Sequence, residues 1–166
     1  EVSRALKNLT LIVDTREQDT DRLRRRIKQT GLSFVRQKLD FGDYSAKTTL
    51  DNGTEFDISS SVSIERKMNL DELCACYCKG RKRFTREFDR AKLAGAKVYL
   101  LIENANWEKA YNGSYRSKMS PQALTASLFA WLARYNCQII FCKEETSGKI
   151  IREILYREMK ERLENG

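Results

Sequence analysis

The segment SVSIERKMNLDEL, residues 61–73, places charged side chains directly after an apolar stretch. Its alternating pattern is typical of a β-strand, in which successive side chains point to opposite faces. Glu65 and Lys67 therefore share one face, whereas Ile64 and Arg66 share the other. Charge at the end of a buried strand is costly unless it has a partner or a function. An acid and an amine that point the same way from such a strand form a candidate catalytic pair.

Three further acids are predicted to lie near strand ends. Asp14 ends the first apolar segment, Asp43 follows a Gly turn at the start of a neighbouring strand, and Asp71 falls in the first turn of the helix after Lys67. Mg²⁺ prefers oxygen ligands and usually takes only a few carboxylates together with water. Carboxylates that converge with Lys67 would suit metal-assisted phosphodiester hydrolysis, in which the lysine orients or activates water or stabilises phosphate charge. A capped strand with surface ion pairs is the alternative interpretation.

The composition narrows the chemistry and suggests a partner. The 166 residues include 31 Lys plus Arg against 23 Asp plus Glu, a net charge of +8 that favours a polyanion such as nucleic acid. There is no His, which excludes Ser-His-Asp, Cys-His and His-based nuclease mechanisms. Two basic segments, residues 22–28 and 79–86, offer Lys and Arg to phosphates, although each could equally be a solvated helix face.

Hydrophobic periodicity predicts a mixed α/β fold. Strands are expected at residues 10–17, 32–40, 41–50 after a turn, 56–67, 97–103 and 138–143, with a hairpin turn at 51–54. Helices are expected at residues 19–31, 70–78, 84–93, 120–135 and 147–163, with a polar, aromatic-rich loop at 104–119. Early strands would pair as hairpins and later strands alternate with helices. The prediction is a three-layer α/β/α sandwich with a central mixed sheet, in one domain over residues 1–166.

Several spaced motifs together carry a family resemblance. GDY at 42–44, followed by ERKMNLD at 65–71, matches the GD…ERKxxxD signature of the ERCC4 nuclease family. VDTRE at 13–17 resembles the first strand of that family, and GRKRF…REF at 80–88 followed by VYLLIE resembles its basic helix and next strand. The sequence is therefore similar to the XPF/Mus81-type structure-selective endonucleases.

The resemblance implies a restriction-endonuclease-like, PD-(D/E)XK-type fold and assigns roles to particular side chains. Asp43 and Glu65 would be the principal ligands of Mg²⁺ or Mn²⁺, with Asp14 as a further acid near the metal. Lys67 would be the catalytic lysine, and Arg66 the arginine of the catalytic signature. Supporting acids would be Glu17 and Asp71. The DNA-binding residues would be Arg83, or Arg81 in an alternative register, together with Lys82 and Arg86.

The function expected from these observations is that of a metal-dependent DNA endonuclease. Its substrates would be branched, flapped or otherwise structured DNA in repair or recombination, and the family implies a homodimer or heterodimer. RNA cleavage stays open, and no nucleotide cofactor or membrane association is expected. The rival is a non-catalytic DNA-binding or scaffold subunit, which would be expected to lose the acids or the lysine that this sequence retains.

Two further expectations concern organisation and compartment. The 166 residues contain no helix-hairpin-helix module of the kind that grips duplex DNA in family members that cut branched substrates. The N-terminal segment has no apolar stretch typical of a secretion signal. The expected location is the cytoplasm or nucleoid for a bacterial or phage source, or the nucleus for a eukaryotic one.

Overall fold

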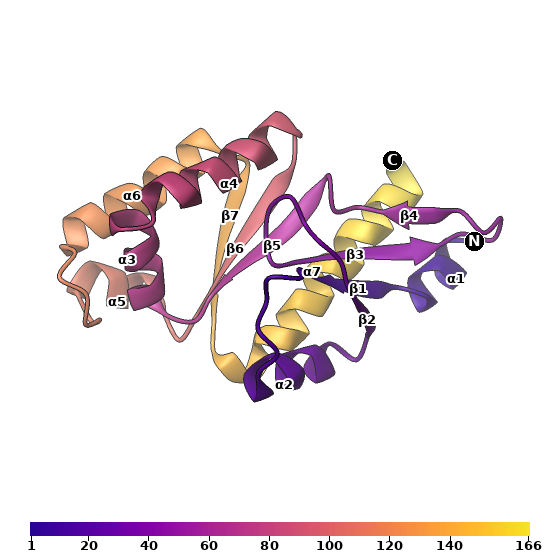
Figure 1. The fold of residues 1–166 in the computed structure, drawn as a ribbon, viewed down its shortest axis with the longest axis horizontal. Helices are drawn as coiled ribbons and strands as arrows, with labels where there is room; N and C mark the ends of the chain where they lie inside the picture. The colour runs from indigo at the N-terminus through magenta and orange to yellow at the C-terminus, as the bar shows by residue number, and fades with distance from the viewer.

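A mixed β-sheet forms the centre of the protein, and the computed structural model describes all 166 residues (Figure 1). Its seven strands follow the order β2-β1-β3-β5-β6-β7, and β4 pairs with β3 beside this path. The strands are β1 (Thr10–Val13), β2 (Ser33–Arg36), β3 (Tyr44–Thr49), β4 (Glu55–Asp57), β5 (Val62–Lys67), β6 (Lys97–Glu103) and β7 (Cys137–Cys142).

The directions of the strands decide which ends meet. β5, β6 and β7 are parallel, whereas β3 runs antiparallel to β1, β4 and β5. The start of β3 therefore lies at the same edge of the sheet as the C-terminal ends of β1 and β5. The expectation of early hairpins holds for β3 and β4. It is wrong for β1 and β2, which are parallel because a crossover helix, α2, connects them.

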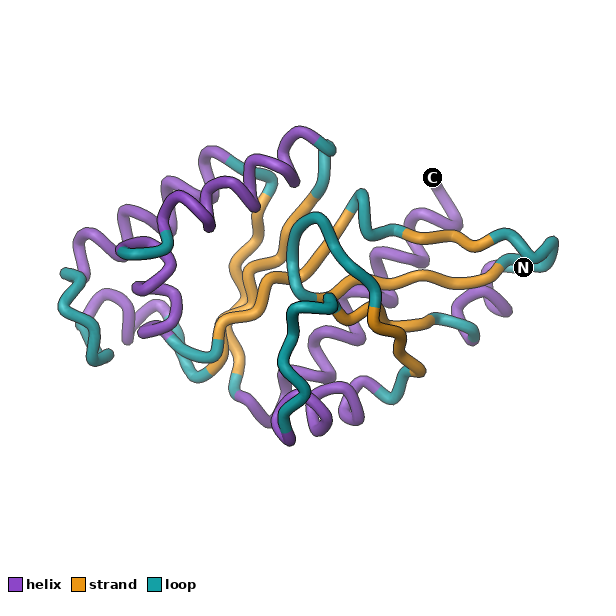
Figure 2. Tube along the Cα trace, viewed as in Figure 1, coloured by secondary structure: helices purple, strands orange, loops and turns teal.

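Helices cover both faces of the sheet, and Figure 2 shows the resulting layers. They are α1 (Val2–Lys7), α2 (Asp21–Thr30), α3 (Leu70–Cys78), α4 (Arg81–Leu93), α5 (Trp107–Asn112), α6 (Pro121–Arg134) and α7 (Glu144–Asn165). One hydrophobic core lies between the sheet and α3, α4 and α6, and a second lies between the sheet and α2 and α7. This is the predicted three-layer arrangement. None of the helices combines the length and the hydropathy that a membrane span requires.

Strand β6 contributes to both cores because its side chains alternate. Leu100 and Ile102 face the core of α3, α4 and α6, whereas Leu101 faces the core of α2 and α7. In the first core the ring of Trp131 stacks on that of Phe84, with 5.5 Å between the ring centroids. The apolar side chains of α6 are therefore used mainly inside the domain rather than on its surface.

Local sequence signals place several helix ends correctly. The Asn69 side chain accepts a hydrogen bond from the Glu72 N–H at 2.9 Å, so Asn69 is the N-cap of α3, as predicted. Ser120 caps α6 in the same way through the Ala123 N–H, and Pro occupies the first turn of that helix. Gly31 ends α2 with φ of 68°, a left-handed conformation that glycine adopts without strain.

Other boundaries differ from the prediction. The expected strand at 56–67 is divided into β4 and β5 by a turn, and both pieces pair with β3. The expected loop at 104–119 contains α5, whose N-cap Asn106 accepts a hydrogen bond from the Lys109 N–H. Helix α4 begins at Arg81, three residues before the predicted start, and α1 has no counterpart in the sequence-based prediction.

Candidate active site

Backbone hydrogen bonds bring three acidic segments together at one edge of the sheet. The Asp14 N–H donates to the Asp43 carbonyl at 2.9 Å, and the Asp43 N–H donates to the Ile64 carbonyl at 2.7 Å. The Arg66 N–H donates to the Asp43 carboxylate at 2.8 Å. Asp43 is thus fixed between the end of β1 and the end of β5, which carries Glu65.

The glycine before Asp43 is required by the close approach of two strands. Gly42 has φ of 81°, and a Cβ at this position would lie 2.3 Å from the Ser63 hydroxyl oxygen. Any other side chain would push the turn away from β5. The Gly42 N–H also donates to the Glu87 carboxylate at 2.7 Å, which ties the turn to α4.

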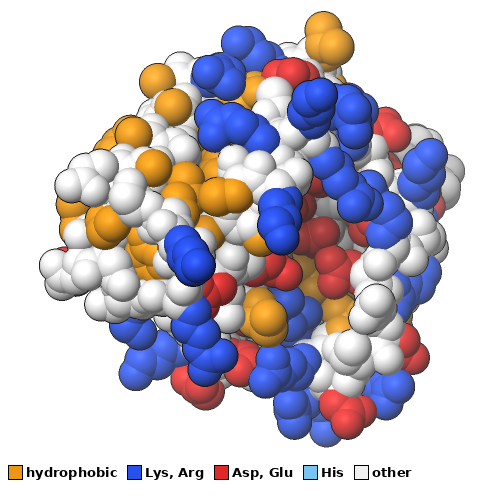
Figure 3. All heavy atoms as spheres, turned by 60° about the vertical axis from the view of Figure 1, so that its left-hand side comes forward, with side chains coloured by type: hydrophobic (Ala, Val, Ile, Leu, Met, Phe, Trp, Pro, Cys, Tyr) orange, Lys and Arg blue, Asp and Glu red, His pale blue; other side chains and the backbone are white.

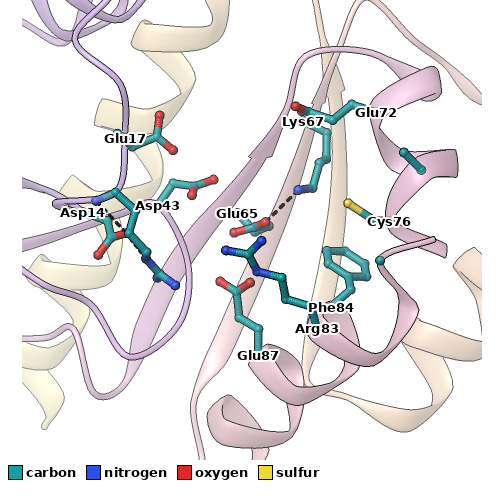
Figure 4. Close-up of a pocket in the computed structure, with 13 residues that line it drawn as sticks. Asp14, Glu17, Asp43, Glu65, Lys67, Glu72, Cys76, Arg83, Phe84 and Glu87 are labelled. Atoms are coloured by element: carbon teal, nitrogen blue, oxygen red, sulfur yellow. Dashed lines mark hydrogen bonds and ion pairs between the residues drawn. The ribbon is translucent and has the colours of Figure 1, made fainter. Parts of the chain in front are cut away.

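Glu65 and Lys67 point into the same pocket, as the strand alternation predicts (Figure 4). The Lys67 Nζ lies 2.9 Å from Glu65 Oε2 and 5.2 Å from the centroid of the Phe84 ring. Glu65 is only 5% exposed. Its second oxygen, Oε1, is buried and has no hydrogen-bond donor in the protein. A buried carboxylate oxygen without a donor is costly, so it marks a position where a ligand would be stabilising.

Burial and like charges perturb the ionisable groups of the site. Burial raises the pKa of the Glu65 carboxyl to about 7; Lys67 opposes this rise and Glu87 adds to it. Burial, with the charges of Glu65 and Glu17, holds the pKa of Asp43 well above its usual range. Burial alone would lower the pKa of Lys67, but the Glu65 carboxylate outweighs it and the pKa of Lys67 is raised. The lysine is therefore a cation at neutral pH.

The pocket around this pair has a volume of about 390 Å³ and an excess of acid. Its acidic side chains are Asp14, Glu17, Asp43, Glu65, Glu72 and Glu87. Its basic side chains are Arg16, Lys67 and Arg83. On the face drawn in Figure 3, Lys and Arg side chains surround a hollow that contains acidic side chains. An acid-rich pocket with a basic rim suits a cation that in turn binds an anionic substrate.

The donor set fits a hard divalent cation. No three acidic or sulfur side chains already converge closely enough to form a metal cluster. Mg²⁺ does not need such a cluster, because it is usually bound by one or two carboxylates, several waters and phosphate oxygens of the substrate. Asp43 and Glu65, which both line the pocket and of which Glu65 has an oxygen without a hydrogen-bond partner, could supply that small carboxylate set.

Two further predicted acids also line the pocket. Asp14 is 1% exposed and is held by the Leu39 N–H at 2.8 Å and by the Arg16 guanidinium at 2.6 Å. Glu17 lies beside Asp43 at the opposite wall from Lys67 (Figure 4). Of the predicted DNA-binding residues, Arg83 lines the pocket and has no acidic partner within 4.0 Å. Figure 4 shows its guanidinium close to Glu65.

Other predicted site residues lie outside this pocket. The Asp71 carboxylate accepts the backbone N–H groups of Arg116 and Ser117, both at 2.8 Å, and so holds the loop after α5. The Arg66 guanidinium points to the opposite face and makes two hydrogen bonds of 2.7 Å to the Glu103 carboxylate. The Arg81 guanidinium lies over the rings of Tyr77 and Trp131, and the exposed Lys82 and Arg86 do not line the pocket.

Sequence reasoning missed Glu87 and Glu72. Glu72 lines the pocket, and its carboxylate accepts a hydrogen bond from the Met68 N–H at 2.8 Å at the start of α3. Glu87 lies four residues after Arg83 on α4, so both point the same way, and Figure 4 shows both directed toward Glu65. That four-residue spacing was the signal available in the sequence, since Arg83 was already a candidate.

The comparison with family models shows which protein family the chain belongs to. A family model described as ERCC4 domain matches residues 13–154. The chain belongs to the ERCC4 domain family. Members of this family are generally nucleases. The matched part of this ERCC4 domain runs from the end of β1 into α7 and contains every acidic and basic residue of the pocket.

The fold of this ERCC4 domain is also found among solved structures. It is similar to XPF from Aeropyrum pernix, with a TM-score of 0.62 and 18% sequence identity. The similarity covers 95% of this chain and 62% of that chain, so this chain spans less than two thirds of the solved one. The comparison with curated proteins found no match. The family and the fold predicted from the sequence are confirmed.

Proposed function

We propose that this ERCC4 domain is a metal-dependent DNA endonuclease that hydrolyses phosphodiester bonds with Mg²⁺ or Mn²⁺ as cofactor. One observation carries the proposal: the buried Glu65 carboxylate has an oxygen without a donor, beside Lys67 and in a pocket shared with Asp43. The bound metal would supply Lewis-acid stabilisation of the phosphate and a water of lowered pKa. Asp43 and Glu65 would hold it, with Asp14 as a further nearby acid.

The protein side chains would stabilise negative charge on the phosphate and orient the metal ligands. Lys67 is held as a cation by Glu65, so its contribution is stabilisation of negative charge that develops on the phosphate rather than removal of a proton. Arg83, without an acidic partner, is available to a phosphate oxygen at the mouth of the pocket. Arg66 acts indirectly, because its backbone N–H orients the Asp43 carboxylate.

The basic rim supports DNA as the substrate. The net charge of +8 contrasts with the acid excess inside the pocket, as expected for a site that binds a polyanion through a cation. Family membership extends the proposal to branched, flapped or otherwise structured DNA in repair or recombination, and to work as a homodimer or heterodimer. Lys82 and Arg86 are exposed on α4 and available to the DNA backbone, whereas Arg81 is engaged with aromatic rings.

A cleavage assay tests this function. Purified protein is expected to nick labelled DNA in the presence of Mg²⁺ or Mn²⁺. Cleavage should stop when EDTA is added and resume when excess metal is restored. A panel of branched, flapped, duplex and single-stranded DNA, with RNA equivalents, would identify the preferred substrate. Glu65→Gln should remove the activity while the circular dichroism spectrum is retained. Binding to the panel without cleavage at any divalent metal would instead indicate a non-catalytic subunit.

Glu87→Gln is expected to weaken Mn²⁺ binding by about tenfold or more, the scale seen for residues that support metal ligands. Glu87 faces Glu65 in the pocket, so its loss removes negative charge next to the proposed metal. Gln can still accept the Gly42 N–H, so the turn before Asp43 should be kept. Isothermal titration or the electron paramagnetic resonance signal of free Mn²⁺ would measure the change.

Asp89→Asn is the matched control for Glu87→Gln. It removes the same charge from the same helix, but Asp89 accepts a hydrogen bond from the Tyr135 hydroxyl and does not line the pocket. Its Mn²⁺ affinity should remain close to that of the wild type. Equal affinities for the wild type and Glu87→Gln would show that Glu87 only supports the Gly42 turn.

A further inference from the structure

A second cavity, of about 380 Å³, adjoins the active-site pocket on the side of α2. Four guanidinium groups line it, those of Arg16, Arg22, Arg26 and Arg66, and we call it the arginine cavity. It shares Arg16 and Glu17 with the active-site pocket, so the two hollows are neighbours. None of the residues proposed above to bind metal lines it.

The buried part of the arginine cavity carries unbalanced positive charge. Arg26 is 5% exposed, and its Nε lies 3.5 Å from the Glu103 carboxylate. The same carboxylate is already bound at 2.7 Å by two nitrogens of Arg66. The Arg26 Nη1 donates a hydrogen bond to an uncharged group, the Tyr44 hydroxyl, at 2.8 Å. Two guanidinium groups therefore share one carboxylate, and their remaining positive charge faces the cavity.

At the mouth of the arginine cavity Arg16 is paired with Asp14 and Glu17 adds an acid, so Arg22 is the cation that is most weakly paired there. Arg22 is 56% exposed, and its one ion pair, with Glu144, is long at 3.5 Å. Thr20, the N-cap of α2, also lines the cavity, so the positive end of the helix dipole lies there. Arginine groups beside a helix N-terminus form a favourable binding site for phosphate.

We propose that the arginine cavity binds a backbone phosphate of the DNA strand that enters the active site, one or a few nucleotides from the bond that is cut. This inference rests on the proposed function, because it makes the two adjoining hollows consecutive positions on one strand. The cavity would set how the strand lies against Glu65 and Lys67. Arg22 is its most accessible cation, and Arg26 and Arg66 provide its fixed charge.

Arg22→Gln tests the proposal without disturbing the buried charges. Its affinity for DNA, measured by fluorescence anisotropy in EDTA at low salt, should fall, and the slope of log affinity against log salt should decrease by about 0.7 to 0.9. Arg24→Gln is the control, since Arg24 lies on the same helix but pairs with Asp19 at 2.8 Å and does not line the cavity. Equal effects of the two substitutions would overturn the proposal, as would no effect of Arg22→Gln.

A scan of neutral methylphosphonate linkages would locate the contact. One linkage near the cut position should weaken binding by the wild type and have no further effect on Arg22→Gln. If no linkage shows this coupling while the protein still cuts DNA, the inference fails and the proposed function stands. If the coupling is present but no metal supports cleavage, the proposed function fails alone. Binding of inorganic phosphate that depends on Arg22 but does not compete with DNA would indicate an independent anion site and overturn the DNA assignment.

Discussion

Lys67→Met is expected to slow DNA cleavage by about 10²- to 10³-fold, the loss typical when one stabilising charge or donor is removed from a transition state. Lys67 is the only lysine that lines the pocket, and its Nζ lies 2.9 Å from Glu65 Oε2. Methionine keeps an unbranched apolar side chain against the Phe84 ring, so the packing should be retained. Single-turnover rates at saturating Mn²⁺ would measure the chemical step apart from DNA release.

Lys160→Met provides the matched control for this prediction. Lys160 is a partly exposed residue of α7 whose only ionic contact is with Glu164 at 3.8 Å. Its cleavage rate should stay near that of the wild type, and Mn²⁺ titration should confirm that Lys67→Met still binds metal. A Lys67→Met protein that cuts at the normal rate would show that another cation, with Arg83 the nearest candidate, stabilises the phosphate.

The central part of the site was predictable because it depends on local rules. Strand alternation places Glu65 and Lys67 on one face whatever surrounds them, and the structure has them 2.9 Å apart. Asp14 directly follows β1 and Asp43 directly precedes β3. Because these two strands are antiparallel neighbours, the two acids lie at the same edge of the sheet. The family signature then selected these residues from 23 acidic side chains.

The remaining residues of the site depend on how elements pack together, which local spacing alone does not fix. Glu87 reaches the pocket because α4 packs against β6 with Phe84 and Phe88 buried, which fixes the outward faces of the helix. Asp71 lies in the first turn of α3, close to Lys67 in sequence, yet its carboxylate accepts the backbone N–H groups of Arg116 and Ser117. The sequence therefore places Asp71 near Lys67 along the chain, whereas its carboxylate contacts the loop after α5 and does not line the pocket.

Two errors in the assignment of strands, by contrast, had local signals in the sequence. The turn between β4 and β5 contains Ser59, Ser60 and Ser61, which are residue types typical of turns, and the Asp57 side chain accepts a hydrogen bond from the Ser59 N–H there at 2.8 Å. The parallel pairing of β1 and β2 follows from the helix between them, which the sequence predicted at residues 19–31 but which was not used to assign the pairing. The pairing of Glu103 with both Arg26 and Arg66 joins residues 77 and 37 positions away, and no periodicity could reveal it.

Glu103→Gln is expected to lower the free energy of unfolding by about 3–5 kcal/mol, the cost of breaking a buried ion pair by removing one partner. Glu103 is fully buried and binds Arg66 through two hydrogen bonds of 2.7 Å, with Arg26 at 3.5 Å. Gln can accept one bond but cannot neutralise either guanidinium. Urea unfolding would measure the loss, and Glu153→Gln, which breaks an exposed pair on α7, should cost far less.

Because Glu103 pairs with both Arg26 and Arg66, removing one arginine should destabilise the protein less than removing the carboxylate. Arg66→Met should cost less than Glu103→Gln, because Arg26 would still neutralise Glu103, whereas Glu103→Gln leaves two buried cations without a counter-charge.

Burial alone would raise the pKa of Glu103, but Arg66 and Arg26 hold it below its usual 4.5. Its contribution is therefore present above about pH 4.5 and is lost as the pH falls through the lower folded-state pKa. The stability gap between the wild type and Glu103→Gln should narrow in acid. A constant gap, or a larger loss for Arg66→Met, would show that Glu103 does not balance both arginines.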